Sequence, residues 1–332
     1  MSIPDELCLL QRAVDARLPL PDEDHHSAIR LFNGFTEGVP RLAVDLYGST
    51  LVIFNHAEPP EGLHPLITEG ISWLLERFPW LGTVILKERS GDAESRRGRL
   101  AWDGKPDDRI REAGTWYAVD LRMNQDASFY LDTRPLRAWL RENLKGKTLL
   151  NTFAYTGSLG AAALAGGAAR VVQTDRNPRF LSLAKMTCEL NGFPVRNADF
   201  IAGDFYRVAG SFKHRGEQFD CAVLDPPFFS TTPAGRVDLN RSITRLINKL
   251  RPLVRSGGWL AVVNNALYVP GVACVAELER LCEGGWLSLE EILQVPPDVT
   301  GYAHTRKGAA PVDPAPFNHP TKMVILKVRH KG

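Results

Sequence analysis

The chain has 332 residues, of which 44% are hydrophobic and 23% are charged, and its formal net charge is +2. This length suits two domains, and the composition is that of a globular protein that can bury a full core. A net charge so close to zero excludes a basic field over the whole molecule, so any nucleic-acid site would be a local basic patch.

Cysteine usage and the first residues indicate the compartment. The five cysteines are scattered, with no C-x-x-C pair and no metal-ligand spacing against the eight histidines, which is typical of free thiols in a reducing cytosol. Residues 1–7 contain no basic stretch followed by an apolar run, so they do not resemble a signal peptide. We therefore expect a cytoplasmic protein without metal or membrane segment, and the sequence leaves its oligomeric state open.

The first third of the chain predicts a small α+β domain. Residues 1–26 carry mixed charge and are interpreted as a short leader. Strand-like stretches around one stretch with helical spacing of apolar residues give a β-β-α-β-β domain over residues 27–118. Arg96, Arg97 and Arg99 fall in a predicted loop, which is either simply solvated or contacts phosphate. The predicted strands are 29–32, 42–46, 51–55, 83–86 and 116–121, and the helix is 62–78.

From residue 148 onward, strands alternate with helices, which is typical of an α/β fold with a doubly wound, mostly parallel sheet. Two last strands, joined by a long loop rich in Pro and Gly, are expected to complete one edge as an antiparallel pair. We predict a seven-stranded Rossmann-like sheet in a domain over residues 119–332. The strands are 148–150, 171–174, 199–202, 220–224, 259–263, 287–295 and 323–328, and the helices are 160–169, 178–191, 240–254 and 272–283.

A turn of small residues between the strand at 148–150 and the helix at 160–169 is a candidate cofactor site. Backbone N–H groups at such a helix N-terminus meet an anionic ligand group. Asp175 lies 18 residues after Gly157 and suits two ribose hydroxyls. The pattern is not G-x-G-x-x-G and no phosphate-binding Lys follows, so the carboxylate of S-adenosylmethionine fits better than a pyrophosphate. The alternative is an ordinary strand-to-helix turn with an acidic helix cap.

Two further acidic residues follow apolar strands. Asp204 can accept a hydrogen bond from an exocyclic amine such as that of adenine, or it can cap the turn that follows. The tetrapeptide Asp225-Pro226-Pro227-Phe228 ends a strongly apolar strand, where ligand sites of open α/β sheets lie. Its prolines stiffen the loop, its carboxylate and carbonyls are acceptors, and its phenyl ring can stack on a planar group. The alternative is a turn that only ends the strand.

In these motifs the chain resembles the class I S-adenosylmethionine-dependent rRNA methyltransferases of the RlmI/RlmK type. The resemblance covers about residues 27–332, and the F-Y-L-D-x-R and N-x-F-A-Y-T-G pieces are the most specific. The motifs that carry it are Arg30-Leu-Phe-Asn-Gly34, Leu42-Ala-Val-Asp45-Leu-Tyr-Gly48, Asn124-Gln-Asp-Ala-Ser-Phe129-Tyr-Leu-Asp132-Thr-Arg134, Asn151-Thr-Phe-Ala-Tyr-Thr-Gly157, Asp175, Gly203-Asp204 and Leu224-Asp-Pro-Pro-Phe-Phe-Ser230.

The resemblance implies an RNA-side small domain, S-adenosylmethionine as cofactor, and a reaction centre at Asp225 to Phe228. Two departures matter. The N-terminal RNA-binding PUA domain of some members has no room in this sequence. Members that methylate carbon 5 of cytosine have a Cys-rich segment where this chain has Asn264-Asn265, which looks more like the member that methylates nitrogen 7 of guanine. The predicted cofactor-binding residues are Tyr130, Asp132, Arg134, Asn151, Phe153, Ala154, Tyr155, Thr156, Gly157, Asp175, Arg176, Asp204, Phe205 and Asp225.

We therefore predict a methyltransferase that acts on a base of RNA, with ribosomal RNA as the favoured substrate and nitrogen 7 of guanine as the favoured atom, without a covalent enzyme–base intermediate. Cys221, Cys274 and Cys282 are expected to be core residues. The alternatives are a methyltransferase for a small planar metabolite, a cytosine carbon-5 methyltransferase of rRNA, and a cofactor-binding RNA chaperone without turnover. A clustered basic surface would favour RNA, and an enclosed apolar pocket over Phe228 would favour the metabolite.

Overall fold

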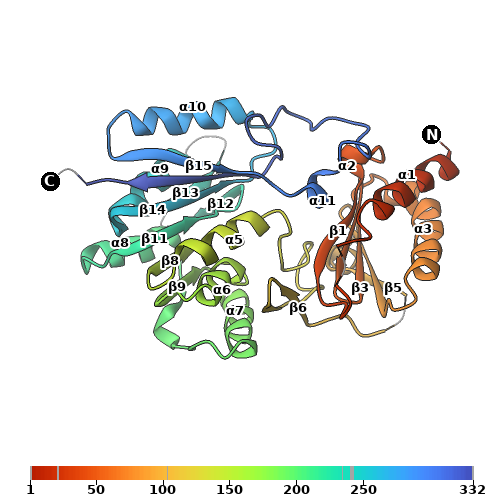
Figure 1. Ribbon diagram of the computed structural model, residues 1–332, viewed down its shortest axis with the longest axis horizontal. Coiled ribbons are helices and arrows are strands. Elements are labelled where there is room, and N and C mark those ends of the chain that lie inside the picture. Colours follow the sequence, from red (N-terminus) through yellow and green to blue (C-terminus); the bar gives the residue numbers. More distant parts are fainter. Residues whose placement is uncertain (1, 21, 103, 234, 240–242, 331–332) are drawn as a thin grey trace. The chain divides into compact units, whose positions relative to one another are not determined.

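The computed structural model describes residues 2–20, 22–102, 104–233, 235–239 and 243–330. It divides into two compact units (Figure 1). The small unit contains Met1–Asp132 and Pro296–Ala310, and the large unit contains Thr133–Val295 and Pro311–Gly332. This division differs from the predicted boundary at residue 118, because residues 119–132 and the later segment Pro296–Ala310 pack with the small unit.

A five-stranded sheet lies at the centre of the small unit, in the order β1-β2-β3-β4-β5. β3 and β4 are parallel and are connected through helix α3, and the other neighbours are antiparallel. The strands are β1 (Ala28–Asn33), β2 (Leu42–Tyr47), β3 (Thr50–Asn55), β4 (Thr83–Glu88) and β5 (Arg99–Trp102), and the helices are α1 (Ile3–Asp15), α2 (Gly34–Glu37), α3 (His64–Arg77), α4 (Ala93–Arg97) and α11 (Pro297–Thr300).

Two predictions for this unit need correction. The strand expected at 116–121 is β7 (Thr115–Ala118), which pairs with β6 (Arg109–Glu112) as a hairpin outside the five-stranded sheet. Its place in the sheet is taken by β5, whose residues are all exposed and therefore lack the alternation that marks a half-buried strand. Arg96 and Arg97 lie in helix α4, which Asp92 caps, and not in a loop.

The predicted leader contains helix α1, which begins with a capping box between Ser2 and Asp5. Leu10, Ala13 and Val14 of this helix are buried in the core of the small unit. The charged residues between them give the segment a mixed composition, which conceals an apolar stripe at helical spacing. The segment is therefore part of the small unit's fold.

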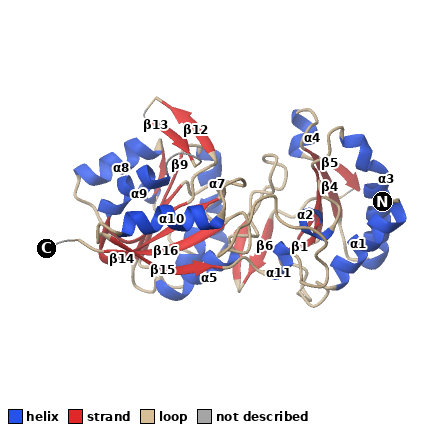
Figure 2. Cartoon of the chain, turned by 90° about the horizontal axis from the view of Figure 1, so that it is seen from above, coloured by secondary structure: helices blue, strands red, loops and turns tan. Residues whose placement is uncertain are grey.

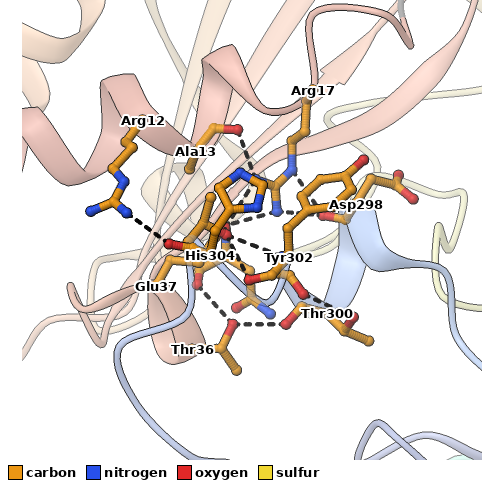
Figure 3. A network of polar contacts seen from close by, with 12 residues as sticks. Arg12, Ala13, Arg17, Thr36, Glu37, Asp298, Thr300, Tyr302 and His304 are labelled. Atoms are coloured by element: carbon orange, nitrogen blue, oxygen red, sulfur yellow. Dashed lines mark hydrogen bonds and ion pairs between the residues drawn. The ribbon is translucent and has the colours of Figure 1, made fainter.

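A buried polar network holds the returning segment Pro296–Ala310 on the small unit (Figure 3). Arg17 is fully buried and forms an ion pair with Glu37 at 3.0 Å. Its guanidinium also donates to the backbone carbonyl of Asp298 at 3.0 and 2.7 Å. The hydroxyl of Thr305 donates to the same Glu37 carboxylate. Removing one ionic partner would leave the other buried and unpaired, which is strongly destabilising.

The large unit contains the predicted seven-stranded sheet, in the order β10-β9-β8-β11-β14-β16-β15. The pairs from β10 to β14 are parallel, and β16 pairs antiparallel with both β14 and β15, as expected for the last two strands. The strands are β8 (Thr148–Thr152), β9 (Arg170–Asp175), β10 (Phe200–Ala202), β11 (Phe219–Leu224), β14 (Val254–Asn264), β15 (Leu287–Leu293) and β16 (Lys322–Val328).

Helices cover both faces of this sheet, which confirms the doubly wound α/β fold (Figures 1 and 2). Apolar residues of α8, α9 and α10 share one core with alternate residues of the strands, while α6 packs on β8 and β9 and contacts α5 and α7. Strand order changes direction between β8 and β11, and ligands bind at such a switch point, outside the carboxyl ends of the strands. The helices are α5 (Arg134–Asn143), α6 (Ser158–Ala165), α7 (Pro178–Leu190), α8 (Phe205–His214), α9 (Ile243–Leu250) and α10 (Gly271–Cys282).

Some elements of the large unit differ from the prediction. Helices α5 and α8 and the hairpin of β12 (Phe229–Thr232) and β13 (Gly235–Asp238) were not predicted. The first residues of the helix predicted at 240–254 lie outside the described residues, and α9 ends at Leu250 because Pro252 removes a backbone donor. β14 then begins at Val254, earlier than expected. Within the described residues, every helix is too short or too polar to cross a bilayer.

Candidate functional site

The turn between β8 and α6 has an unusual backbone. Phe153 and Tyr155 have φ values of 53° and 50°, a left-handed conformation that costs energy for non-glycine residues and often marks functional sites. Gly157, with φ of 81°, is the residue before α6. The N–H of Ala154 donates to the carbonyl of Thr174 at 2.9 Å, which fixes the turn to the end of β9. The predicted glycine turn is therefore a rigid loop at the carboxyl edge of the sheet.

Gln173 packs beneath this turn, and sequence reasoning missed it. A Cβ on Gly157 would lie 2.8 Å from its Oε1 atom, and a Cβ on Gly160 would lie 2.6 Å from the same atom. The amide of Asn151 donates to this oxygen at 3.3 Å. Within the described residues, the Asn151 Oδ1 and Gln173 Nε2 atoms are buried without a hydrogen-bond partner. One polar residue inside the apolar strand Val171–Thr174 was the signal that could have revealed it.

Asp175 ends β9 and organises the turn. Its Oδ2 atom accepts the N–H of Tyr155 at 3.0 Å, and its Oδ1 atom accepts the N–H of Asn177 at 2.8 Å. Burial raises the pKa of this carboxyl, while the backbone donors at Asn177, Tyr155 and Arg176 act in the opposite direction. A carboxylate offers about four lone-pair positions. These backbone donors use most of that capacity, and the contact of Asp175 with ribose hydroxyls stays a prediction.

Asp204 is the N-cap of α8, since its Oδ1 atom accepts the N–H groups of Tyr206 and Arg207 at 2.9 and 3.3 Å. Its cofactor contact stays a prediction. Phe205 follows it and stacks on Phe153, with ring centroids 4.9 Å apart and planes 23° from parallel. The structure thus brings together aromatic residues from the turn after β8 and from the start of α8, beside the end of β9.

The other predicted cofactor residues are placed as follows. Arg134 is the first residue of α5, Thr156 is buried in the glycine turn, and Arg176 is exposed directly after β9. Tyr130 and Asp132 belong to the small unit, where the hydroxyl of Tyr130 donates to Asp126 at 3.0 Å. The site residues of the large unit therefore converge on one sheet edge.

The predicted acceptor loop follows β11. Asp225 is half-buried, Pro226 is buried, and the exposed fraction of Phe228 is 43%. The side-chain amide of Asn265, after the neighbouring strand β14, donates to the Pro226 carbonyl at 3.3 Å. Asn264 is buried, and its Oδ1 atom accepts the N–H of Ala266 at 2.9 Å. Asn265 therefore connects the loops that follow the two adjacent parallel strands β11 and β14, and Asn264 fixes its own loop.

Burial makes three thiols of the large unit poor nucleophiles. Cys221 and Cys274 are buried, and Cys282 is half-buried. Burial raises the pKa of Cys274 to about 11 and raises the pKa of Cys221 and Cys282 as well. The thiolate is the reactive form of cysteine, so these side chains are unreactive at neutral pH. Among the described residues, no group of His, Cys, Asp and Glu side chains could hold a metal ion.

Comparison with known proteins agrees with this geometry. Residues 90–306 match the sequence profile of the S-adenosylmethionine-dependent methyltransferase family. The chain is 31% identical over 227 residues to the ribosomal RNA large subunit methyltransferase I of Aeromonas salmonicida, covering 68% of this chain and 57% of that protein. The Photobacterium profundum protein of the same name is 30% identical over 253 residues, covering 72% of this chain and 62% of that protein. The match thus spans less than two thirds of these relatives' length.

A solved structure extends the likeness of fold to nearly the whole chain. The protein SMU.776, described as a candidate methyltransferase in complex with SAH, has a TM-score of 0.83 and 20% sequence identity. The match covers 99% of this chain and 82% of that protein. It includes the small α+β unit as well as the seven-stranded sheet, which supports the predicted combination of folds.

Proposed function

The chain belongs to the S-adenosylmethionine-dependent methyltransferase family, and we propose that it methylates a base of large-subunit ribosomal RNA, at nitrogen 7 of guanine. The names of the matched relatives support the RNA substrate. The choice of atom is supported by Asn264 and Asn265, which occupy the segment where the resemblance places the thiol of the carbon-5 enzymes, and Asn265 instead donates to the Pro226 carbonyl. Methylation at carbon 5 of a pyrimidine requires prior addition of a thiolate to the ring.

The bound cofactor supplies a methyl group on a sulfonium, which is already electrophilic. Asp175 would hold the ribose, and the strained turn from Phe153 to Gly157, whose N–H groups at Ala154, Tyr155 and Gly157 donate within the protein, would shape the pocket for the amino-acid end. Asp225 and the Pro226 carbonyl accept hydrogen bonds from the base, and Phe228 stacks on its ring. Nitrogen 7 of guanine has a free lone pair and loses no proton before attack, so positioning supplies most of the acceleration. A base inside folded RNA would have to be flipped out first.

The test is methyl transfer to deproteinised large-subunit rRNA from cells that lack this gene, with purified protein and S-adenosylmethionine carrying a labelled methyl group. After digestion to nucleosides, mass spectrometry should find the label in 7-methylguanosine. The same nucleoside should be missing from the rRNA of the deletion strain and present in wild type. Label in 5-methylcytidine would replace the purine assignment with the cytosine one. Absence of label from RNA, with turnover of a small planar metabolite, would overturn the RNA substrate.

A further inference from the structure

A cavity of about 380 Å³ lies in the small unit, on the second face of its sheet. Side chains alternate between the two faces along a strand. In β2, Leu42 and Val44 belong to the apolar core shared with α1 and α3, whereas Asp45 and Tyr47 line the cavity. The volume is within the range of about 300–1,000 Å³ that is usual for ligand pockets. The cavity is therefore large enough to hold a small planar group.

The segment Asn124–Asp132 forms part of the cavity wall and is anchored to the sheet. The hydroxyl of Tyr47 donates to the carbonyl of Phe129 at 3.1 Å. Lys87 is buried, and its Nζ atom donates to the carbonyls of Asn124 and Asp126 at 2.7 and 2.9 Å. These bonds satisfy the lysine and fix the wall, so the cavity exists before any ligand binds.

The charged residues of the lining are Arg30, Lys87, Arg89, Arg96, Asp45, Asp126 and Asp132, and two of the arginines are exposed and outside any ion pair among the described residues. Arg30 and Asp45 neutralise each other through two hydrogen bonds of 2.7 and 3.1 Å. Burial, with Arg89 and Arg30 nearby, lowers the pKa of His56 to about 4, so this ring is neutral at pH 7. Arg89 and Arg96 line the cavity, are exposed, and form no ion pair within the part of the chain that the structure describes. Guanidinium groups in this state suit phosphate oxygens.

Flat rings complete the lining. Phe35 and Tyr130 are large side chains with exposed fractions of 44% and 46%, and both line the cavity. Aromatic rings beside free arginines are the elements that bind unpaired nucleotides, by stacking on the base and by contact with the phosphate. The methyl donor contains no phosphate, so the two arginines fit RNA better than the cofactor.

We propose that this cavity binds one unpaired nucleotide of the RNA substrate, with its phosphate on Arg89 and Arg96 and its base against Phe35. The site gives the RNA a second anchor in addition to the base that is methylated. This inference rests on the proposed function, because it takes RNA as the substrate.

The test compares two pairs of substitutions with the same change of charge. Arg89→Gln with Arg96→Gln removes the two exposed cations of the cavity. Arg77→Gln with Arg41→Gln removes two exposed arginines of the small unit that do not line it, and the contact of Arg77 with Asp15, at 4.0 Å, is too long to contribute much stability. Binding of a short unstructured oligoribonucleotide is measured by fluorescence anisotropy over a salt series, and binding of S-adenosylmethionine by calorimetry.

The cavity pair should weaken RNA binding at least tenfold and reduce the salt slope by about 1.4, since each lost phosphate contact contributes about 0.7 for single strands. The control pair should change the RNA affinity and the salt slope much less. Phe35→Leu should weaken binding about 5- to 150-fold at an unchanged slope, because it removes stacking without charge. Cofactor affinity should stay within twofold in all variants.

Three results would overturn the inference. Equal losses in the two arginine pairs would show general electrostatic attraction, and a loss of cofactor affinity in the cavity pair would assign the cavity to the cofactor. A wild-type protein that does not bind the oligoribonucleotide has no single-strand site. If that protein still methylates rRNA, the proposed function stands without the cavity site, and if it does not, both fail.

Discussion

Replacement of Asp175 by alanine tests the cofactor site most directly. The carboxylate accepts one backbone N–H on each oxygen, from Tyr155 and from Asn177, and it is expected to accept from the ribose hydroxyls as well. Leaving buried donors without an acceptor costs about 1–3 kcal/mol. Affinity for S-adenosylmethionine should therefore fall by about 5- to 150-fold, since 1.4 kcal/mol corresponds to a factor of ten.

Asp220→Ala is the matched control. Asp220 lies in β11 near its amino end, at the opposite edge of the same sheet, and it accepts the N–H and the hydroxyl of Thr148 at 2.7 and 2.8 Å. Both variants lose hydrogen bonds from backbone N–H to a carboxylate, so both should be less stable by about 1–3 kcal/mol. Only Asp175→Ala should lose cofactor affinity, because only that carboxylate lies at the carboxyl ends of the strands.

Calorimetric titration with S-adenosylmethionine and with its demethylated product measures the affinities, and thermal unfolding with and without ligand checks them through linkage. An unchanged affinity in folded Asp175→Ala would remove this residue from the site. Equal weakening in Asp220→Ala would mean that the affinity follows general stability. Tight binding of NAD by the wild-type protein would refute the cofactor assignment altogether.

Asp225→Ala and Phe228→Ala should sharply lower turnover and leave cofactor affinity within a few-fold, because both residues position the acceptor. Methyl-transfer assays measure turnover and calorimetry measures cofactor affinity. Equal losses of turnover and of cofactor affinity would place the loop in the donor pocket or in a structural role. The lowered pKa of His56 means that the unfolded chain binds a proton below pH 6.5 while the folded protein does so only below about 4, so stability should decline by about 3 kcal/mol as pH falls through this window. Denaturant titrations of His56→Gln over this pH range should show a flatter decline, and a slope identical to that of the wild-type protein would contradict the assignment. RNA that carries 5-fluorocytosine should form no denaturant-stable adduct with the wild-type protein. A folded variant in which Cys221, Cys274 and Cys282 are each changed to alanine should stay active. An adduct that is abolished by one of these cysteine changes would restore the cytosine assignment.

The sequence predicted the large unit well because its strands are buried on both faces. Continuous apolar runs such as Cys221–Leu224, placed between helices, indicate buried parallel strands, whereas the strand order, with β11 between β8 and β14, came only from the structure. The small hairpin of β12 and β13 escaped prediction because its exposed aromatic residue Phe229 follows the acceptor motif without any alternation. Alternating apolar and polar residues reveal strands that border a core, and a short exposed hairpin has no such alternation.

The position of Asp175 at the end of a strand was predictable from the apolar run before it, while its role in the site stays a prediction. Residues whose role depends on packing were not predictable. Gln173 packs beneath both glycines of the turn, and although a polar residue in an apolar strand is unusual, the sequence does not show which residues lie above it. Arg17 lies in the segment that resembles a leader and Glu37 lies in helix α2, so only the fold brings this buried pair together.

The proposed reaction centre has a donor half, which would hold the cofactor, and an acceptor half, which would hold the base. The two halves consist of different kinds of groups, and this difference affects substrate specificity. The donor half consists largely of backbone, held in left-handed conformations at Phe153 and Tyr155, so side-chain substitutions there act through the shape of the turn. The acceptor half consists of the exposed Phe228 and of carbonyl and amide groups fixed by the contact between Asn265 and Pro226. A substitution at Asn265 can therefore alter which base is accepted while the donor stays in place. Since transfer depends on alignment of a lone pair with the methyl group, a small displacement of the Pro226 carbonyl should change the rate far more than the affinity for either substrate.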